Sequence, residues 1–262
     1  ATWFFEDAAE KLIERSVYAG ANYQLTLDLL AAILDTIDWS KTKINKFLHR
    51  AAERQQPELV ELLLKQGADP NHRGAVHTSA IKSAIAEAPV AREITPEQRL
   101  SLRRTVTALL NAGAAVNPAD TEGSETPLAA AVQKGLDDII GLLIDAGADI
   151  NANLSRYSEF TVLGYACQKG DSELIDKIIA GNPSEKSLQE GLMSAVGRGD
   201  PDLVQKLFKV GARSAGFDGL PPLELCREKI AGSEGEEQER YRRIERILLG
   251  AMGVRELPDT LE

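Results

Sequence analysis

The sequence contains few aromatic residues and only two cysteines. Aromatic side chains make up 5% of the 262 residues, so leucine, isoleucine, valine and alanine have to fill most of the interior. Cys167 and Cys226 are too few for a disulfide scaffold or for a cysteine-ligated zinc site. This cysteine usage fits a reducing compartment and favours an intracellular protein.

Membrane-spanning and secretory segments are also missing. No apolar run approaches the roughly 20 residues that cross a bilayer, and the longest candidate, residues 25 to 37, is interrupted by Asp28 and Asp35. The first residues are aromatic and acidic where a secretory signal has a positive region. We therefore expect an intracellular protein without a membrane span. The first residue is Ala1 instead of methionine, which leaves open that the chain is a repeat segment of a larger receptor or effector.

Basic residues are outnumbered by acidic ones. The chain has 30 Lys and Arg against 40 Asp and Glu, a formal net charge of −10. Proteins that bind nucleic acids or membrane surfaces usually carry a basic excess that meets phosphates, so neither class is expected. With 43% hydrophobic residues the chain is too apolar to be disordered. The composition favours another protein as the partner, and we expect the chain to be a monomer.

Residues suited to catalysis or metal binding are scarce. Of the three histidines, His72 and His77 lie on one predicted hairpin, but no cysteine and no third ligand is nearby, so no metal is expected. The chain has no phosphate-binding glycine loop and no Gly-x-Ser-x-Gly elbow. We expect no catalytic residues and no cofactor. The alternative is an enzyme built on the same scaffold, with a pocket formed by residues 86 to 95 or by the N-terminal helices.

A repeated pattern of apolar and small residues organises most of the chain. A leading apolar residue is followed three positions later by a small residue and fifteen positions later by a large aliphatic one, as in Leu128, Ala131 and Leu143. Two short helices cannot bury such a face alone, so the units must stack. The full pattern is present in the units led by Leu48, Leu128, Leu163 and Leu192. We place six units in all, the last two in degenerate form, with the leading residues Leu48, Ile81, Leu128, Leu163, Leu192 and Leu223.

Two short motifs recur at matching offsets within these units. Residues 126 to 128 read Thr-Pro-Leu, and residues 46 to 52 contain Leu-His-Arg-Ala-Ala. Glycine turns of the form Gly-Ala-x-x-Asn occupy residues 67 to 71, 113 to 117 and 147 to 151. In these motifs the chain resembles the ankyrin-repeat family. The resemblance implies an all-α ankyrin-repeat solenoid of about six helix-turn-helix repeats with hairpin loops, and it implies a non-catalytic module that binds a protein partner.

The sequence predicts three parts along the chain. Residues 1 to 43 lack the motifs but show helical periodicity, so they are expected to form a helical cap that covers the apolar side of the first repeat. Residues 44 to 253 form the repeat array, and residues 254 to 262 form a C-terminal tail. The interval from Leu163 to Leu192 is short, which predicts a tight loop after Gly181 in place of a hairpin.

Two second helices are predicted to be longer than the others. Thr95, Pro96 and Gln98 have the spacing of a capping box, which predicts a helix over residues 96 to 111 that leads into the apolar residues from Leu100 onward. Near residues 234 to 249, the pair of Ser233 and Glu236 has the same spacing, and it predicts a second helix of this kind.

The resemblance implies that a partner contacts the concave face, which is formed by the first helices of the repeats, and the hairpin tips. The position six residues after each leading residue lies on that face, and it is basic in five of the six units: Arg54, Lys134, Lys169, Arg198 and Lys229, with Glu87 in the remaining unit. On a protein of net charge −10, such a basic stripe favours an acidic segment as the partner. The alternative is that these lysines and arginines are ordinary helix formers on a solvated face.

Residues at the hairpin tips are the second group of candidates for partner binding. Arg73 and His77 belong to one predicted tip, and Arg156 and Tyr157 belong to another. Tyrosine and arginine are the residue types that dominate binding energy in interfaces, so Tyr157 beside Arg156 is the stronger pair. His49 occupies the signature histidine position of the family, which implies a hydrogen bond within the turn.

Overall fold

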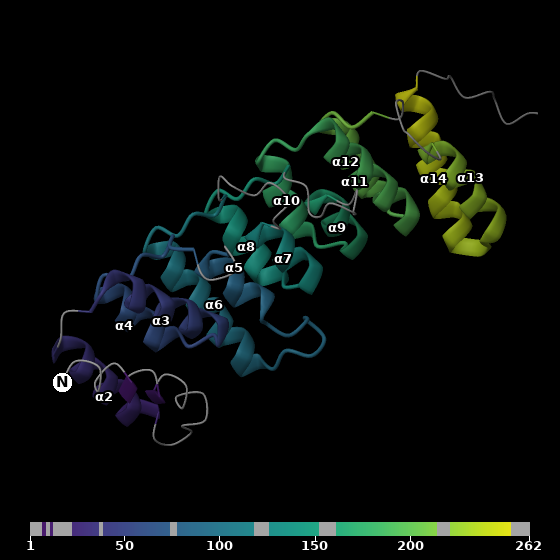
Figure 1. Ribbon diagram of the computed structural model, residues 1–262. Helices are drawn as coiled ribbons and strands as arrows, with labels where there is room; N and C mark the ends of the chain where they lie inside the picture. Colours follow the sequence, from purple (N-terminus) through teal and green to yellow (C-terminus); the bar gives the residue numbers. More distant parts are fainter. Residues whose placement is uncertain are drawn as a thin grey trace, which may run out of the picture. The chain divides into compact units, whose positions relative to one another are not determined.

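The computed structural model describes residues 7–8, 11–12, 23–36, 39–73, 78–117, 126–151, 161–213 and 221–252. In these ranges every regular element is a helix and no strand occurs, so the predicted all-α class is confirmed (Figure 1). The chain divides into two compact units, unit 1 with residues 1–148 and unit 2 with residues 149–262.

The described part of unit 1 consists of three consecutive helix pairs preceded by one helix. The helices are α2 (Tyr23–Thr36), α3 (Lys41–Glu53), α4 (Pro57–Lys65), α5 (Ala80–Ala86), α6 (Pro96–Asn111), α7 (Pro127–Lys134) and α8 (Asp137–Asp145). Helix α2 buries Leu27, Leu30 and Leu34 and packs against α4. The prediction that residues 1 to 43 form a cap over the first repeat stays a prediction.

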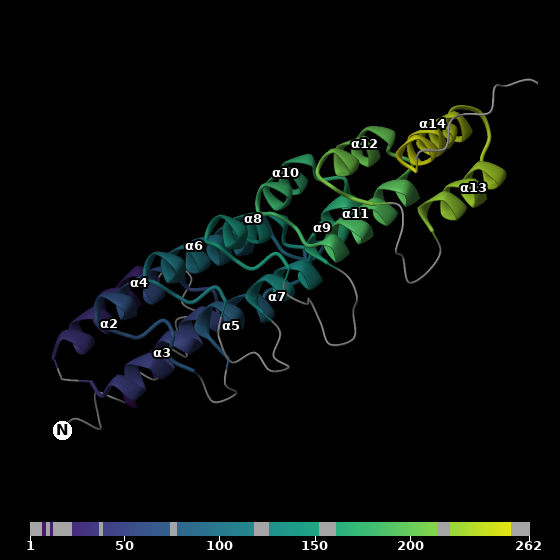
Figure 2. The same ribbon diagram turned by 90° about the horizontal axis from the view of Figure 1, so that it is seen from above.

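The helix pairs of unit 1 stack into two layers. The first helices of the pairs, α3, α5 and α7, pack on one another in order, and the second helices α4, α6 and α8 do the same. Figure 2 shows these two rows of helices side by side. The leading residues Leu48, Ile81 and Leu128 are at most 2% exposed, so the repeat pattern identified the core of this unit.

Unit 2 also consists of helix-turn-helix pairs. Its helices are α9 (Val162–Lys169), α10 (Ser172–Ala180), α11 (Glu185–Arg198), α12 (Pro201–Lys209), α13 (Pro222–Gly232) and α14 (Gly235–Ala251). Helix α11 packs on α9, α12 and α13, and α14 packs on α12 and α13. Only residues 181 to 184 separate α10 from α11, which confirms the predicted tight loop after Gly181.

Local capping explains where the short first helices begin and end. The side-chain oxygen of Thr126 accepts a hydrogen bond of 3.0 Å from the backbone N–H of Ala129, which starts α7. Helices α9 and α11 end at Gly170 and Gly199, whose φ angles of 76° and 68° lie in the left-handed region. Glycine adopts this conformation without the steric cost that a side chain imposes.

Helices α9 and α11 approach closely because a glycine lies where they meet. A Cβ atom at Gly191 would lie 3.0 Å from Cγ of Leu163 and 3.4 Å from Sγ of Cys167. Both of these neighbours are fully buried. The close contact brings the C-terminal ends of the two helices together, and this arrangement positions the candidate site described below.

Side chains at the base of the turns connect consecutive repeats of unit 1. Nε2 of His49 lies 2.7 Å from the backbone oxygen of His72, which confirms the hydrogen bond predicted for this histidine. The carboxamide of Asn71 donates to the backbone oxygen of Gly113 and accepts from the backbone N–H of Ala115. The turns are thus joined by hydrogen bonds as well as by apolar packing.

The two long second helices begin in different ways. Helix α6 has the capping box predicted for it, with Gln98 N–H donating to the Thr95 hydroxyl and Thr95 N–H donating to the Gln98 side chain. The cap predicted for α14 is wrong. Its N-cap residue is Glu234, and the hydroxyl of Ser233 donates instead to the backbone oxygen of Lys229. The carbonyl groups at the end of α13 compete successfully for that hydroxyl.

Candidate functional site

The basic residues of the predicted stripe lie at or near the C-terminal ends of the first helices. Arg54 is the C-cap residue of α3, and Lys134, Lys169 and Arg198 are the last residues of α7, α9 and α11. Lys229 is exposed on α13, three residues before that helix ends. Because a helix C-terminus carries partial negative charge, cations at these positions also stabilise their own helices.

In unit 1, Lys134 is engaged in the fold. Its Nζ atom donates a hydrogen bond of 2.7 Å to the backbone oxygen of Ala88, which follows α5. The backbone N–H of Ala91 in turn donates to the backbone oxygen of Lys134 at 2.8 Å. The side chain is only half-exposed. Lys134 therefore connects two repeats, and one of the three N–H groups of its ammonium is used in that contact.

In unit 2, Arg198 and Lys169 lie together on the surface. Nη1 of Arg198 donates to the backbone oxygens of Gln168 and Lys169 at 3.0 and 3.1 Å. Nζ of Lys169 lies 5.6 Å from the centre of the Tyr165 ring, within the range of a cation–π interaction. We call Tyr165, Lys169 and Arg198 the basic patch. Sequence reasoning missed Tyr165, although its position one helical turn before Lys169 places both side chains on the same face.

The other residues predicted to bind a partner do not belong to the basic patch. Arg54 and Arg73 are exposed in unit 1. His77, Arg156 and Tyr157 lie outside the described residues, so their role stays a prediction. Of the predicted partner-binding residues in unit 2, the structure brings together Lys169 and Arg198.

The two cysteines are packing residues. Cys167 and Cys226 are fully buried. Burial raises the pKa of the Cys167 thiol to about 12, and the negative charge of Asp200 adds to the effect. Burial likewise raises the pKa of Cys226 to about 11, and its Sγ atom donates to the backbone oxygen of Tyr241. Neither thiol supplies a nucleophilic thiolate near neutral pH.

Metal-binding clusters and membrane-spanning helices are not found in the described ranges. Among these residues, no three His, Cys, Asp or Glu side chains gather as a metal site would require. No helix in the same part of the chain combines the length and the apolar character needed to cross a membrane.

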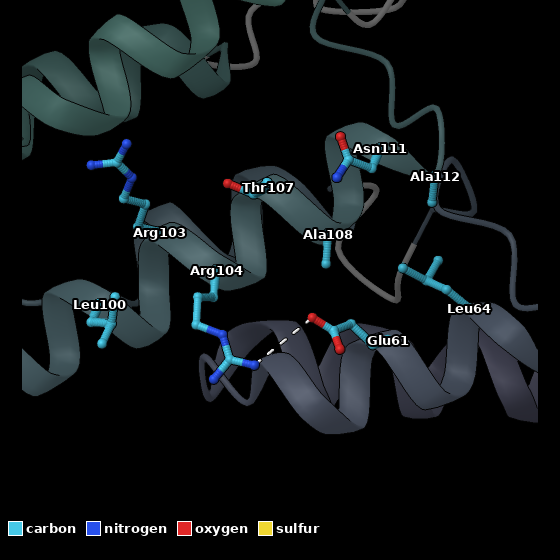
Figure 3. Close-up of a pocket in the computed structure, with 9 residues that line it drawn as sticks. All are labelled: Glu61, Leu64, Leu100, Arg103, Arg104, Thr107, Ala108, Asn111 and Ala112. Atoms are coloured by element: carbon cyan, nitrogen blue, oxygen red, sulfur yellow. Dashed lines mark ion pairs between the residues drawn. The ribbon is translucent and has the colours of Figure 1, made fainter.

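A groove between α4 and α6 in unit 1 is a feature that sequence reasoning missed (Figure 3). Its volume is about 530 Å³, and it is lined by Glu61, Leu64, Leu100, Arg103, Arg104, Thr107, Ala108, Asn111 and Ala112. Leu100 is 59% exposed, whereas Val106 and Leu109 on the same helix are fully buried. A leucine placed away from the buried stripe of its helix is the signal that could have indicated this groove.

Comparison with known proteins agrees with the repeat pattern. The family model described as ankyrin repeat matches residues 48–75 and 124–153. The human protein named ankyrin repeat and SOCS box protein 6 is 38% identical to this chain over 110 residues. That match covers 40% of this chain and 24% of the human protein, so the chain corresponds to about a quarter of that relative's length.

Solved structures show the same architecture. An ankyrin repeat domain from Acinetobacter baumannii is 25% identical, with a TM-score of 0.56, and the match covers 78% of this chain and 97% of that one. The ankyrin repeat domain of Bcl-3, a member of the IkappaB protein family, is 22% identical with a TM-score of 0.57. The second match covers 90% of this chain and 96% of that domain.

Proposed function

The chain belongs to the ankyrin-repeat family, and we propose that it is a non-catalytic module that binds an acidic segment of a partner protein. The partner contacts the exposed ends of the first helices, and the module acts as a monomer. The observation that supports this most is the basic patch of Tyr165, Lys169 and Arg198. It concentrates two cations and an aromatic ring on a chain of net charge −10.

The geometry of Arg198 favours binding of a carboxylate. One guanidinium nitrogen is fixed by two backbone oxygens, while Nε and Nη2 donate to no residue in the described part of the chain. An arginine that is already held in place loses less conformational entropy when a partner binds. The remaining N–H groups present the forked geometry that matches a carboxylate.

Lys169 and Tyr165 extend the same surface. Both Lys169 and Arg198 are exposed, and the backbone oxygen of Lys169 lies 3.1 Å from the guanidinium nitrogen. The adjacent aromatic ring offers apolar area beside the two charges, which is the composition of strong contact points in interfaces. An acidic segment that carries an apolar side chain next to its carboxylates fits this surface.

The other predicted residues differ in how they would contribute to binding. Lys134 already holds two repeats together, so its replacement would affect stability as well as binding. Arg54, Arg73 and Lys229 are exposed and belong to the proposed surface of their own unit. His77, Arg156 and Tyr157 remain candidates at the hairpin tips.

The test is affinity capture of the partner from the native cell with matched charge variants. Lys169→Glu changes the basic patch, and Lys209→Glu makes the same charge change at the exposed last residue of α12. We expect Lys169→Glu to weaken binding of the captured partner about tenfold, a change of about 1.4 kcal/mol. Lys209→Glu should bind like the wild type. Equal capture by both variants would show that the patch is not the binding surface.

A further inference from the structure

Helix α11 contains one glycine that the packing of the fold does not explain. Gly191 allows the close contact with Leu163, and Gly199 follows the helix with a positive φ angle. Gly197, the second-to-last residue of α11, is exposed, and a Cβ atom added there would meet nothing within 4 Å. Glycine lowers the stability of a helix relative to other residues. At this position it does so without a structural gain.

Gly197 interrupts a row of long side chains on the surface of unit 2. It lies five residues after the leading residue Leu192, and the same position holds Gln168 in α9 and Glu228 in α13. Helix α11 packs on both of those helices, and Gln168 and Glu228 are exposed. The row therefore has a gap at α11, directly beside Arg198 of the basic patch.

The guanidinium group of Arg198 lies low on the same surface. It donates to the backbone oxygens of Gln168 and Lys169, and its Cζ atom would lie 2.6 Å from a Cβ atom at Gly170. The side chain is thus held flat against the end of α9. A carboxylate that meets the remaining N–H groups has to approach close to the helix surface, because such hydrogen bonds are short.

We propose that Gly197 is a specificity-determining residue of the basic patch, which admits an extended acidic segment whose main chain crosses α11 at this glycine. This inference rests on the proposed function of the patch. A glycine allows another backbone to approach closely. A partner helix would keep its own axis about 8–10 Å from that of α11, since side chains separate packed helices. The gap therefore favours an extended segment.

A long side chain at position 197 would close the gap. The glutamine that α9 carries at the equivalent position is the natural choice, because it adds no charge and favours a helix. The matched control is Gly250, which is also exposed, also second-to-last in its helix and also without atoms within 4 Å of an added Cβ atom. It belongs to the second helix α14, away from the first-helix row.

The experiment uses the full chain and a fluorescently labelled short peptide of glutamates around one leucine. Such a peptide is too short to form a stable helix in water. Its Kd is measured by fluorescence anisotropy for the wild type, Gly197→Gln, Gly250→Gln and Lys169→Glu. Thermal denaturation of each protein gives the Tm. Lys169→Glu tests the basic patch itself, and Gly197→Gln tests the gap beside it.

The expected result is that binding and stability change in opposite directions. Gly197→Gln should weaken the peptide about tenfold, while its Tm rises by about 2 °C because glutamine is the better helix former. Gly250→Gln should raise the Tm similarly and bind the peptide like the wild type. A glycine that served only the fold would give a lower Tm when replaced.

Two sets of outcomes distinguish this inference from the proposed function. If Lys169→Glu weakens binding and Gly197→Gln does not, the role of Gly197 is overturned and the basic patch remains the binding surface. A lower Tm of Gly197→Gln, or equal weakening by Gly250→Gln, also overturns it. If the wild type does not bind the peptide, or if Lys169→Glu binds it equally well, the proposed function fails and the inference fails with it.

Discussion

The guanidinium group of Arg198 lies directly over Gly170, the residue that ends helix α9. A Cβ atom at Gly170 would lie 2.6 Å from Cζ of Arg198, closer than real Cβ atoms approach a neighbour. Arg198 donates from this position to the last carbonyl groups of α9. Glycine is favoured here by the left-handed backbone, and a side chain at this position would also displace the guanidinium group of Arg198.

This contact predicts that Gly170→Ala destabilises unit 2 by about 2 kcal/mol, because alanine is strained at positive φ and displaces the hydrogen-bonded guanidinium. Gly67→Ala is the matched control, since Gly67 has a φ of 85° and nothing lies within 4 Å of its added Cβ atom. Gly67→Ala should lower the free energy of unfolding by about 1 kcal/mol, because it introduces only the strain of alanine at positive φ. Urea denaturation measures both changes.

A double-mutant cycle separates the two causes. If Gly170→Ala displaces the guanidinium, Arg198→Ala should cost about 1 kcal/mol less in the Gly170→Ala background than in the wild type. Additive effects of the two substitutions would mean that the arginine does not depend on the glycine. The contact between Arg198 and Gly170 would then make no measurable contribution to stability.

The features that could be predicted from the sequence are local in the chain or repeated along it. The leading residues and the small residues after them identified the first helices because stacking buries the leading residue in five of the six units. Leu223, which leads the last unit, is only half-buried. The capping box of α6 was visible because Thr95 and Gln98 are three residues apart and need no other partner. The same spacing failed at Ser233, whose hydroxyl is bound by the end of the preceding helix.

The features that could not be predicted depend on contacts between repeats. The stripe positions were identified by their offset, but Lys134 and Arg198 bind carbonyl groups 46 and 30 residues away, which no local pattern reveals. The groove depends on how α4 and α6 pack. Arg104 reaches Glu58 across 46 residues of sequence. The repeat pattern is enough to predict the fold. The side-chain contacts on the surface depend on residues that are far apart in the sequence.

Replacing threonine by valine should have opposite effects on stability at two positions in unit 1. Thr105 is fully buried in α6, and its hydroxyl has no hydrogen-bond partner in the described structure. Thr105→Val should therefore stabilise unit 1 by about 1 kcal/mol, since the cost of burying an unpaired hydroxyl is removed. The hydroxyl of Thr126 caps α7, so Thr126→Val should destabilise the unit by about 1 kcal/mol.

Thermal and urea denaturation of the two threonine variants provide the measurement. Both replace a hydroxyl by a methyl group, so the difference between them isolates the hydrogen bond. A loss of stability in Thr105→Val comparable to that in Thr126→Val would indicate that the Thr105 hydroxyl has a partner after all, such as a buried water.

The buried thiols predict a loss of stability at alkaline pH. Burial raises the pKa of Cys167 to about 12 and that of Cys226 to about 11, whereas an exposed cysteine titrates near pH 8.5. Above about pH 8.5 the unfolded chain releases thiol protons that the folded chain keeps, so the unfolded state binds fewer protons and stability falls as pH rises. Below that pH both states are protonated, and the thiols add no pH dependence.

The expected slope is up to about 1.4 kcal/mol per pH unit for each buried thiol, measured as the urea unfolding free energy between pH 8 and pH 10.5. Cys167→Ala should reduce this slope, even though the lost packing lowers stability at pH 8. The two proteins differ only at residue 167, so the difference in slope is assigned to that thiol. Rapid reaction of Cys167 with Ellman's reagent at pH 8 without urea would contradict the buried, protonated state from which the prediction follows.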